Sequence, residues 1–182
     1  MKENIRKEAL AARKNLTKEE RVEKSFKICS KFIKSRYFSE SQIIFVYFAT
    51  PYEVDTSMIL KTSFKESKRV ALPVSYDDGA MYFAEISDIN GLYKGNFGVF
   101  EPDKSLKEVL PQKGDVFIVP GVAFDYHKNR LGHGKGFYDR YFSKYKDTIK
   151  IGLAYGVQLF ESIPSEENDV KMDFIITENG FI

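Results

Sequence analysis

The chain has 182 residues, of which 43% are hydrophobic and 30% charged, with a formal net charge of +2. This size and balance predict one soluble globular domain with a full hydrophobic core. The longest apolar runs are far below the roughly 20 residues of a membrane span, and the N-terminus lacks the apolar segment of a secretory signal, so we expect a cytoplasmic protein with no membrane partner. The single cysteine, Cys29, excludes an internal disulfide.

A helix is predicted over residues 3–15, because apolar residues recur at spacings of four, three and four. These residues are Ile5, Ala9, Ala12 and Leu16. Three cations, Lys2, Arg6 and Arg13, fall along one edge of that stripe, where long side chains can reach into a cleft. Residues 1–36 hold 12 Lys and Arg against 5 Asp and Glu. This excess favours an acidic ligand nearby or, alternatively, a solvated helix surface.

Thr17 and Glu20 form the sequence pattern of a capping box, which predicts that a second helix begins there. Its expected buried stripe is Val22, Phe26, Cys29 and Ile33, widened by Phe32. Cys29 is therefore expected to pack as a small hydrophobic residue.

The run at 42–48 is almost continuously apolar and β-branched, which is typical of a strand buried on both faces of a parallel sheet. A helix is expected at about 57–66, and further strands at 69–73, 81–86, 116–119, 149–156 and 173–177. Strands that alternate with helices predict an α/β fold, a three-layer α/β/α sandwich with a mostly parallel, Rossmann-like sheet in a single domain over 1–182. The irregular run 96–102 could line a pocket.

The central motif follows the strand Val116–Val119 and consists of Arg130-Leu131-Gly132-His133-Gly134-Lys135-Gly136, after which a helix begins. Alternate glycines allow positive φ and a close approach of the backbone to an anion. The first turn of the helix then favours negative charge, with Arg130 and Lys135 as neighbouring cations. The spacing matches neither the dinucleotide fingerprint nor the P-loop. The alternative is a simple tight connection.

Two carboxylates are candidates for Mg²⁺, which proteins often bind through one or two carboxylates together with substrate phosphates. Asp139 falls in the first turn of the helix after the glycine loop, where it could instead simply favour the helix dipole. Asp173 precedes the last strand. His133 is either a phosphate donor or an exposed loop residue. Glu53 follows the strand at 42–48, at an end of the sheet where ligands bind. No spacing supports a covalent nucleophile.

The central motif resembles that of the 5-formyltetrahydrofolate cyclo-ligase family, and the similarity extends over essentially the full length. The residues that carry it are Pro120-Gly121-Val122-Ala123-Phe124-Asp125, Arg130-Leu131-Gly132, Gly134, Gly136 and Tyr138-Asp139-Arg140. Lys2-Glu3-Asn4-Ile5-Arg6 with Arg13 and Leu16, Glu53-Val54-Asp55-Thr56, and Asn168-Asp169 with Asp173 are also similar. Phe137 departs from the pattern, since many members have tyrosine there.

The resemblance implies an enzyme that uses ATP and Mg²⁺ to convert 5-formyltetrahydrofolate into 5,10-methenyltetrahydrofolate, releasing ADP and phosphate. The formyl oxygen would attack the γ-phosphate, and N10 would then close the ring. By this resemblance ATP is held by Lys2, Arg6, Arg130, Leu131, Gly132, His133, Gly134, Lys135, Gly136, Phe137 and Tyr138. Of these, Arg130, Lys135 and Tyr138 are expected to be catalytic. Phe48 and Glu53 would contact the folate, Asp139 and Asp173 would serve Mg²⁺, and Arg13 would join the nucleotide group.

The expected partners are therefore a small folate substrate and ATP, with the protein acting as a monomer. Three alternatives remain open. A catalytically silent folate- or nucleotide-binding protein would lack a cation or carboxylate at the loop, and both are present. A nucleic-acid-binding module would need stacking aromatics beside the basic segment, and residues 1–25 contain none. A sugar-phosphate isomerase or acyl-CoA transferase rests on fold analogy alone.

Overall fold

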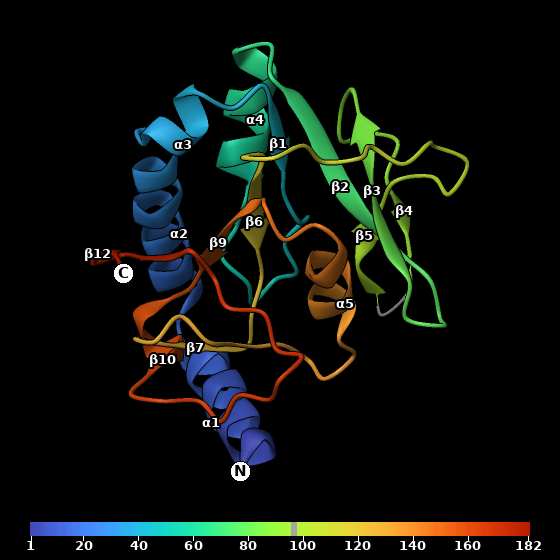
Figure 1. Cartoon of the computed structure of the whole chain (residues 1–182). Helices are drawn as coiled ribbons and strands as arrows, with labels where there is room; N and C mark the ends of the chain where they lie inside the picture. The colour runs from blue at the N-terminus through green and yellow to red at the C-terminus, as the bar shows by residue number, and fades with distance from the viewer. Residues whose placement is uncertain (96–97) are drawn as a thin grey trace.

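The computed structural model describes residues 1–95 and 98–182, which are built around a seven-stranded sheet (Figure 1). Its strand order is β12-β11-β9-β6-β1-β2-β3. The strands are β1 (Ile43–Phe45), β2 (Arg69–Ser75), β3 (Met81–Ile86), β6 (Val116–Val119), β9 (Ile149–Leu153), β11 (Phe174–Thr177) and β12 (Gly180–Phe181). All pairings are parallel except those of the edge strands β3 and β12. The mostly parallel α/β sheet predicted from the sequence is confirmed.

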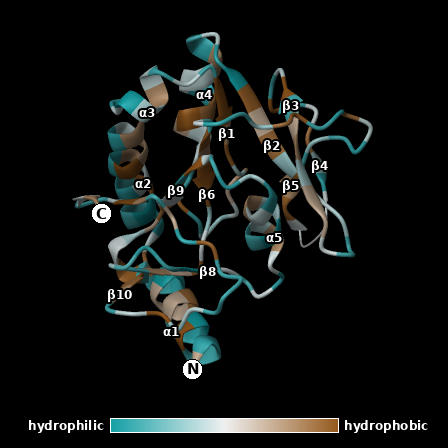
Figure 2. Cartoon of the chain, viewed as in Figure 1, coloured by the Kyte–Doolittle hydropathy of each residue, from teal (hydrophilic) through white to brown (hydrophobic). Residues whose placement is uncertain are grey.

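The central strands bury both faces, as their continuous apolar runs predict. Along β1, Ile44 faces one hydrophobic cluster while Ile43 and Phe45 face another. Phe45 lies in register with Ala71 of β2 and Phe117 of β6 and stacks on Phe117 at 4.2 Å between ring centroids. Helices cover the two clusters on opposite faces, which gives the expected three layers. Figure 2 shows hydrophobic strands inside and largely hydrophilic outer helix surfaces.

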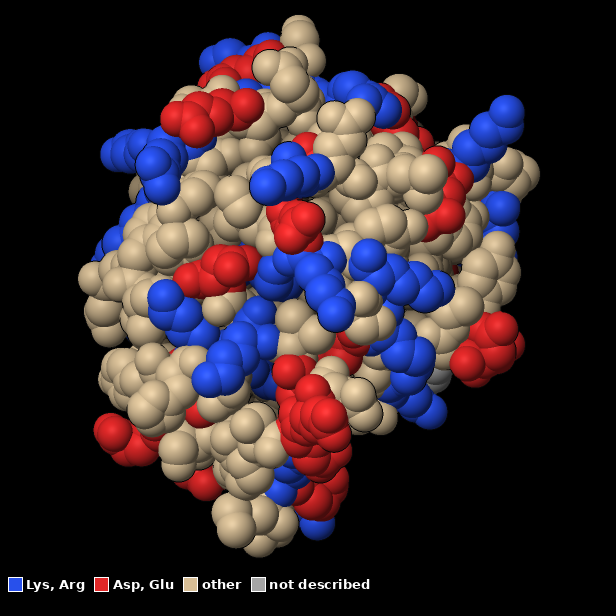
Figure 3. Space-filling view, in the orientation of Figure 1, with Lys and Arg blue, Asp and Glu red and all other residues tan. Residues whose placement is uncertain are grey.

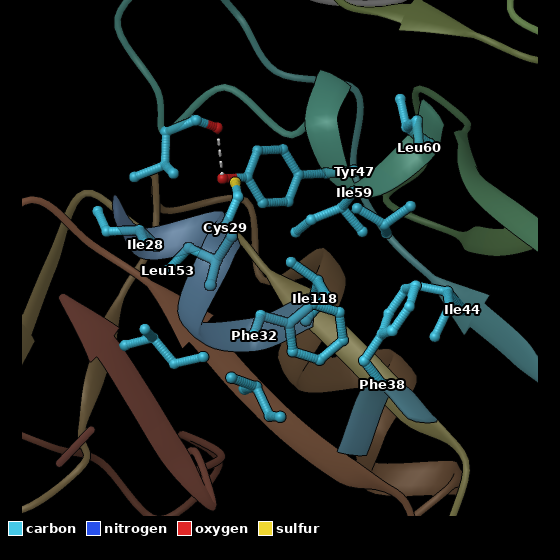
Figure 4. Close-up of a cluster of buried hydrophobic side chains, with 14 of the residues drawn as sticks. Ile28, Cys29, Phe32, Phe38, Ile44, Tyr47, Ile59, Leu60, Ile118 and Leu153 are labelled. Carbon is cyan, nitrogen blue, oxygen red and sulfur yellow. Dashed lines mark hydrogen bonds between the residues drawn. The ribbon is translucent and has the colours of Figure 1, made fainter. Parts of the chain in front are cut away.

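The first face is covered by α2 (Lys18–Ile33), α3 (Arg36–Ser39) and α4 (Ser57–Lys65). Ile28, Cys29 and Phe32 of α2 are fully buried in this core, where Phe32 meets Phe38 (Figure 4). The Tyr47 hydroxyl donates to the Val54 carbonyl at 2.9 Å in the same cluster, which ties the segment after β1 to the chain leading into α4.

The predicted face of α2 was partly wrong. The capping box is present, since the Glu20 N–H donates to the Thr17 hydroxyl. However, Val22 and Phe26 are each 61% exposed. The buried face instead contains Ser25, which hydrogen-bonds Tyr155 and the N–H of Asp55, both at 3.0 Å. The predicted burial of Cys29 and Phe32 is confirmed, but a hydrophobicity pattern could not include Ser25, because this buried residue is polar.

The second face is covered by α5 (Phe137–Lys144), whose Tyr141 and Phe142 pack against Phe83 and Phe117. The glycine loop that precedes α5 is thereby fixed to the sheet. Two short strands, β4 (Tyr93–Lys94) and β5 (Phe100–Glu101), form a hairpin in the segment expected to be irregular. Residues 96 and 97 of the predicted pocket-lining run lie outside the described residues.

The N-terminal helix α1 (Lys2–Asn15) lies beyond the carboxyl ends of the central strands (Figure 1). It packs through Ala9 onto a small sheet in the order β10-β7-β8. These strands are β7 (Ala123–Asp125), β8 (Arg130–Leu131) and β10 (Leu159–Phe160), the last after a 3₁₀ turn, η2 (Gly156–Gln158). α1 therefore approaches the glycine loop. In the two described ranges, no helix has both the length and the apolar composition needed to cross a membrane.

Candidate active site

A cavity of about 1360 Å³ opens where the strand order of the sheet reverses. β1 pairs with β2 on one side and with β6 on the other, so the chain leaves a crevice at the carboxyl ends of β1 and β6. The residues after β1 that line the cavity are Tyr47, Phe48, Thr50 and Glu53, and those after β6 are Pro120 and Gly121. α1, the glycine loop and the segment 166–170 supply the remaining walls on that side.

The glycines of the central motif have the conformations that the sequence predicts. Gly134 and Gly136 have φ values of 92° and 68°, which are costly for other residues. A Cβ at Gly132 would lie 2.9 Å from Nη1 of Arg130, and one at Gly136 would lie 2.7 Å from Nη1 of Arg140. The glycines thus allow guanidinium groups to pack directly against the backbone, at a loop that forms one wall of the cavity.

Arg130 links the glycine loop to α5. Its Nη2 donates to Oδ2 of Asp139 at 2.9 Å, and its guanidinium lies 5.4 Å from the ring centre of Tyr138. The other carboxylate oxygen of Asp139 accepts the Val170 N–H at 3.1 Å. Arg130 is only 8% exposed, and its Nε has no hydrogen-bond partner within the ranges that the structure covers. The guanidinium is therefore rigidly held beside the loop.

The three cations predicted to share an edge of α1 all line the cavity. Arg6 donates through Nε to the Gly132 carbonyl at 2.9 Å, which fixes the loop to the helix. Lys2 already contacts Asp169 at 2.6 Å and Glu166 at 3.0 Å. Burial alone would lower the pKa of Lys2, but these carboxylates raise it overall.

Arg13 is the most unusual of these cations, because it is only 5% exposed although it carries a full charge. Its Nε and Nη1 have no acceptor in the described part of the chain. A buried donor without a partner costs about 1–3 kcal/mol. Since the side chain lines the cavity, a bound anion could supply the missing acceptor.

The surroundings of two residues at the glycine loop shift their pKa values in the direction that favours the neutral form. His133 is exposed at the mouth of the cavity, but partial desolvation of its ring lowers its pKa, an effect that Glu53 opposes and the guanidinium groups of Arg13 and Arg6 reinforce. Burial raises the pKa of Tyr138 far above its ordinary value. His133 is therefore suited to donate an N–H to an anion, and Tyr138 to act as an O–H donor.

Charge in the cavity is mixed but predominantly positive. Eight cations line it: Lys2, Arg6, Arg13, Arg130, Lys135, Arg140, Lys146 and Lys150. Six carboxylates do so: Glu53, Glu101, Asp139, Glu166, Glu167 and Asp169. Figure 3 shows Lys and Arg side chains gathered over the middle of the face viewed, around α5, with acidic side chains nearer α1.

The two residues predicted to contact the folate lie on the sheet side of the cavity. Oε2 of Glu53 accepts the Thr50 N–H at 2.8 Å, and the Tyr155 hydroxyl donates to the Glu53 carbonyl at the same distance. Phe48 meets Phe100 edge to face at 5.9 Å. Pro73, Met81 and Val99 add apolar surface to this lobe.

The two predicted metal ligands are placed differently. Asp139 lines the cavity, whereas Asp173 is absent from the residues found to line it. Oδ2 of Asp173 accepts the Lys150 N–H at 2.7 Å and pairs with the Lys150 ammonium at 3.2 Å. Across the described ranges, no cluster of three or more His, Cys, Asp or Glu side chains could by itself hold a metal ion. A single carboxylate beside a phosphate-binding loop still fits Mg²⁺ that is bound mainly by substrate phosphates.

The sequence did not single out several residues that share the cavity. These are Tyr47, Thr50, Ser75, Glu101, Lys146 and Lys150. They come from separate strands and loops, so no local spacing connects them. For Glu101 the only available signal was its place in a run that could line a pocket.

The fold and the cavity together define an α/β protein with a cleft lined by basic side chains at the switch point of its sheet. The model of the 5-formyltetrahydrofolate cyclo-ligase family matches residues 1–178. The 5-formyltetrahydrofolate cyclo-ligase of Haemophilus influenzae is 31% identical, with 94% of each chain covered. That of Escherichia coli is 30% identical over 91% of this chain and 93% of its own.

Solved structures agree with the sequence comparisons. The 5,10-methenyltetrahydrofolate synthetase of Aquifex aeolicus superposes with a TM-score of 0.84 at 34% identity, covering 99% of this chain and 91% of its own. The synthetase of Mycoplasma pneumoniae gives 0.77 at 25% identity, covering 97% and 98%. The chain belongs to the 5-formyltetrahydrofolate cyclo-ligase family and is an enzyme.

Proposed function

We propose that the enzyme converts 5-formyltetrahydrofolate into 5,10-methenyltetrahydrofolate with cleavage of ATP to ADP and phosphate, the formyl oxygen leaving in the phosphate. The observation that carries this proposal is that one cavity is lined by two chemically different groups of residues, which we call its two lobes. One is the cationic glycine loop with Arg130, and the other is the apolar surface around Phe48. A triphosphate and a pterin therefore fit side by side, as transfer between them requires.

We assign the binding of ATP to the glycine loop and to α1. Backbone N–H groups of Gly132 to Gly136, together with Lys135, would hold the phosphates, and Arg6 keeps the loop in place through Gly132. Arg13, whose buried donors lack an acceptor among the described residues, would contact a phosphate oxygen. Arg130 would neutralise charge on the transferring group.

The formamide oxygen is a poor leaving group, and its phosphorylation by ATP makes it a good one. The formyl oxygen attacks the γ-phosphorus, the bond to the β-phosphate oxygen breaks, and ADP leaves. The phosphorylated imidate is then attacked at carbon by N10, which loses its proton, and inorganic phosphate leaves as the ring closes. The enzyme supplies position and positive charge rather than a nucleophile. The protonated Tyr138 would donate its O–H to an oxygen of the transferring group.

Asp139 is the carboxylate that best fits Mg²⁺, because it lines the cavity at the first turn of α5. Both of its oxygens already have protein partners, so it would bind the ion together with substrate phosphates. Bound Mg²⁺ would neutralise phosphate charge. Asp173 could join the ion only by releasing Lys150, and it would otherwise position that lysine at the cavity wall.

The test is an absorbance assay of methenyltetrahydrofolate formation by the purified protein. With 5-formyltetrahydrofolate, ATP and Mg²⁺ the product should accumulate, and ADP should appear in equal amount. Omission of ATP should abolish the signal. If ATP produced no product above the level without it, the protein would be at most a folate- or nucleotide-binding member of the family.

A further inference from the structure

Glu101 occupies a position that the proposed roles leave unexplained. It is the second residue of β5, it is only 5% exposed, and it lines the cavity. One oxygen, Oε1, accepts a hydrogen bond from the Ser75 hydroxyl. The other, Oε2, is buried and has no hydrogen-bond partner within residues 1–95 and 98–182.

A buried carboxylate oxygen without a hydrogen-bond donor destabilises the protein, so a functional reason for Glu101 at this position is to be sought. The β4–β5 hairpin leaves space for the Glu101 carboxylate. Gly95, which follows β4, lies against the carboxylate, and a Cβ there would fall 2.5 Å from Oε2. A side chain at Gly95 would therefore displace the acid. The carboxylate thus has a specific place in the wall of the cavity.

Several apolar side chains line the cavity near Glu101. Ser75 is in register with Met81 across β2 and β3, and Val99 precedes β5 by one residue. Phe100, the neighbour of Glu101, contacts Phe48. Met81, Val99 and Phe48 line the same cavity. The lobe has two acidic groups, of which Glu53 already accepts the Thr50 N–H through Oε2, whereas Oε2 of Glu101 has no donor among the described residues.

We infer that Glu101 binds the aminopyrimidinone edge of the folate's pterin and accepts hydrogen bonds from its N3–H and its 2-amino group. This inference rests on the proposed function and specifies which residue orients its substrate. The pterin edge carries two parallel N–H donors, which match the two oxygens of a carboxylate. Adenine does not match a carboxylate in this way, because its amino group is flanked by ring nitrogens that are acceptors and would repel the carboxylate. The pairing therefore places the pterin, not the adenine, in this lobe.

The test compares 5-formyltetrahydrofolate with its analogue in which hydrogen replaces the 2-amino group. Dissociation constants are measured by titration calorimetry in the absence of ATP, for the wild type and for Glu101→Gln. A hydrogen bond to a charged group contributes about 1.5–3 kcal/mol, so the wild type should prefer the natural substrate about 10- to 100-fold. Glu101→Gln should reduce that preference to about two-fold or less and leave the KM for ATP unchanged.

The matched control is Glu85→Gln, on the neighbouring strand β3, where the acid is exposed and pairs with Arg69. Glu85→Gln should prefer 5-formyltetrahydrofolate over the analogue as strongly as the wild type does. Glu101→Asp retains a shortened carboxylate, so it should bind both ligands more weakly but still distinguish them. This variant serves if Glu101→Gln fails to fold.

Two results would overturn the inference. One is a Glu101→Gln protein that discriminates as strongly as the wild type, and the other is a wild type that binds both ligands equally. Neither depends on turnover. A wild type that discriminates in binding but forms no product with ATP would refute the proposed function alone, so the two failures are distinguishable.

Discussion

Replacing Arg130 with glutamine removes the guanidinium that joins β8 to the first turn of α5. The Arg130 and Asp139 side chains are 4% and 21% exposed and lie 2.9 Å apart. Loss of one partner from a fully buried pair costs about 3–5 kcal/mol. Because Asp139 is partly solvated and keeps the Val170 N–H, we expect a smaller loss than this, about 2–3 kcal/mol in the free energy of unfolding.

The effect on catalysis should be larger than this loss of stability explains. Removal of one preorganised donor from a developing charge lowers turnover by about 10²- to 10³-fold. The assay is ATP-dependent methenyltetrahydrofolate formation, measured well below the melting temperature of the variant. Arg130→Lys keeps the charge but loses the two-pronged donor geometry, so its turnover should be intermediate.

Arg69→Gln is the matched control for Arg130→Gln. Arg69 also pairs with a carboxylate, Glu85, but these side chains are 54% and 41% exposed and lie outside the cavity lining. An exposed pair contributes about 0–1 kcal/mol, and turnover should stay at the wild-type level. If Arg130→Gln retained full turnover, or if Arg69→Gln lost as much, the assignment of Arg130 to the transferring phosphate would be refuted.

Three further changes test other parts of the structure. Gly136→Ala and Gly114→Ala both place alanine at positive φ, so both should lose about 1–3 kcal/mol of stability. Only Gly136→Ala should weaken ATP binding in calorimetry, and equal ATP affinities of the two variants would contradict the role of the loop. Burial raises the pKa of Cys29 to about 12, so its thiol should not react with a thiol reagent until urea unfolds the protein, and rapid native labelling would contradict the packing. Because the pKa of the free His133 is lowered and bound phosphate would raise it, the ATP affinity of the wild type relative to His133→Asn should increase as the pH falls from neutral. A pH-independent ratio of the two affinities would exclude contact with phosphate.

Much of the fold could be predicted from the sequence because burial on both faces imposes a recognisable pattern. The run containing β1 is apolar without alternation, and the structure shows it at the centre of a parallel sheet. The switch point then follows from the topology, which explains why Phe48 and Glu53 lie at the cavity. Local hydrophobicity was only partly successful at α2: it predicted the burial of Cys29 and Phe32, but it included the exposed Val22 and Phe26 and missed the buried, hydrogen-bonded Ser25.

Residue spacing predicted direct contacts within the site only where the partners are close in sequence. Arg130 and Asp139 are nine residues apart on consecutive elements, and the structure joins them directly. Asp173 is different, since the register of β11 with β9 places it beside Lys150, and no sequence spacing encodes that register. Glu101 was missed as an individual residue for the same reason, because its burial depends on the packing of β5 against β2.

The most direct test of the account is to label the formyl oxygen of 5-formyltetrahydrofolate with ¹⁸O and examine the phosphate released during turnover by ³¹P NMR. Attack of the formyl oxygen on the γ-phosphorus predicts that each phosphate carries one labelled oxygen, whereas recovery of the label in water, with unlabelled phosphate, would contradict direct transfer between the two lobes of the cavity.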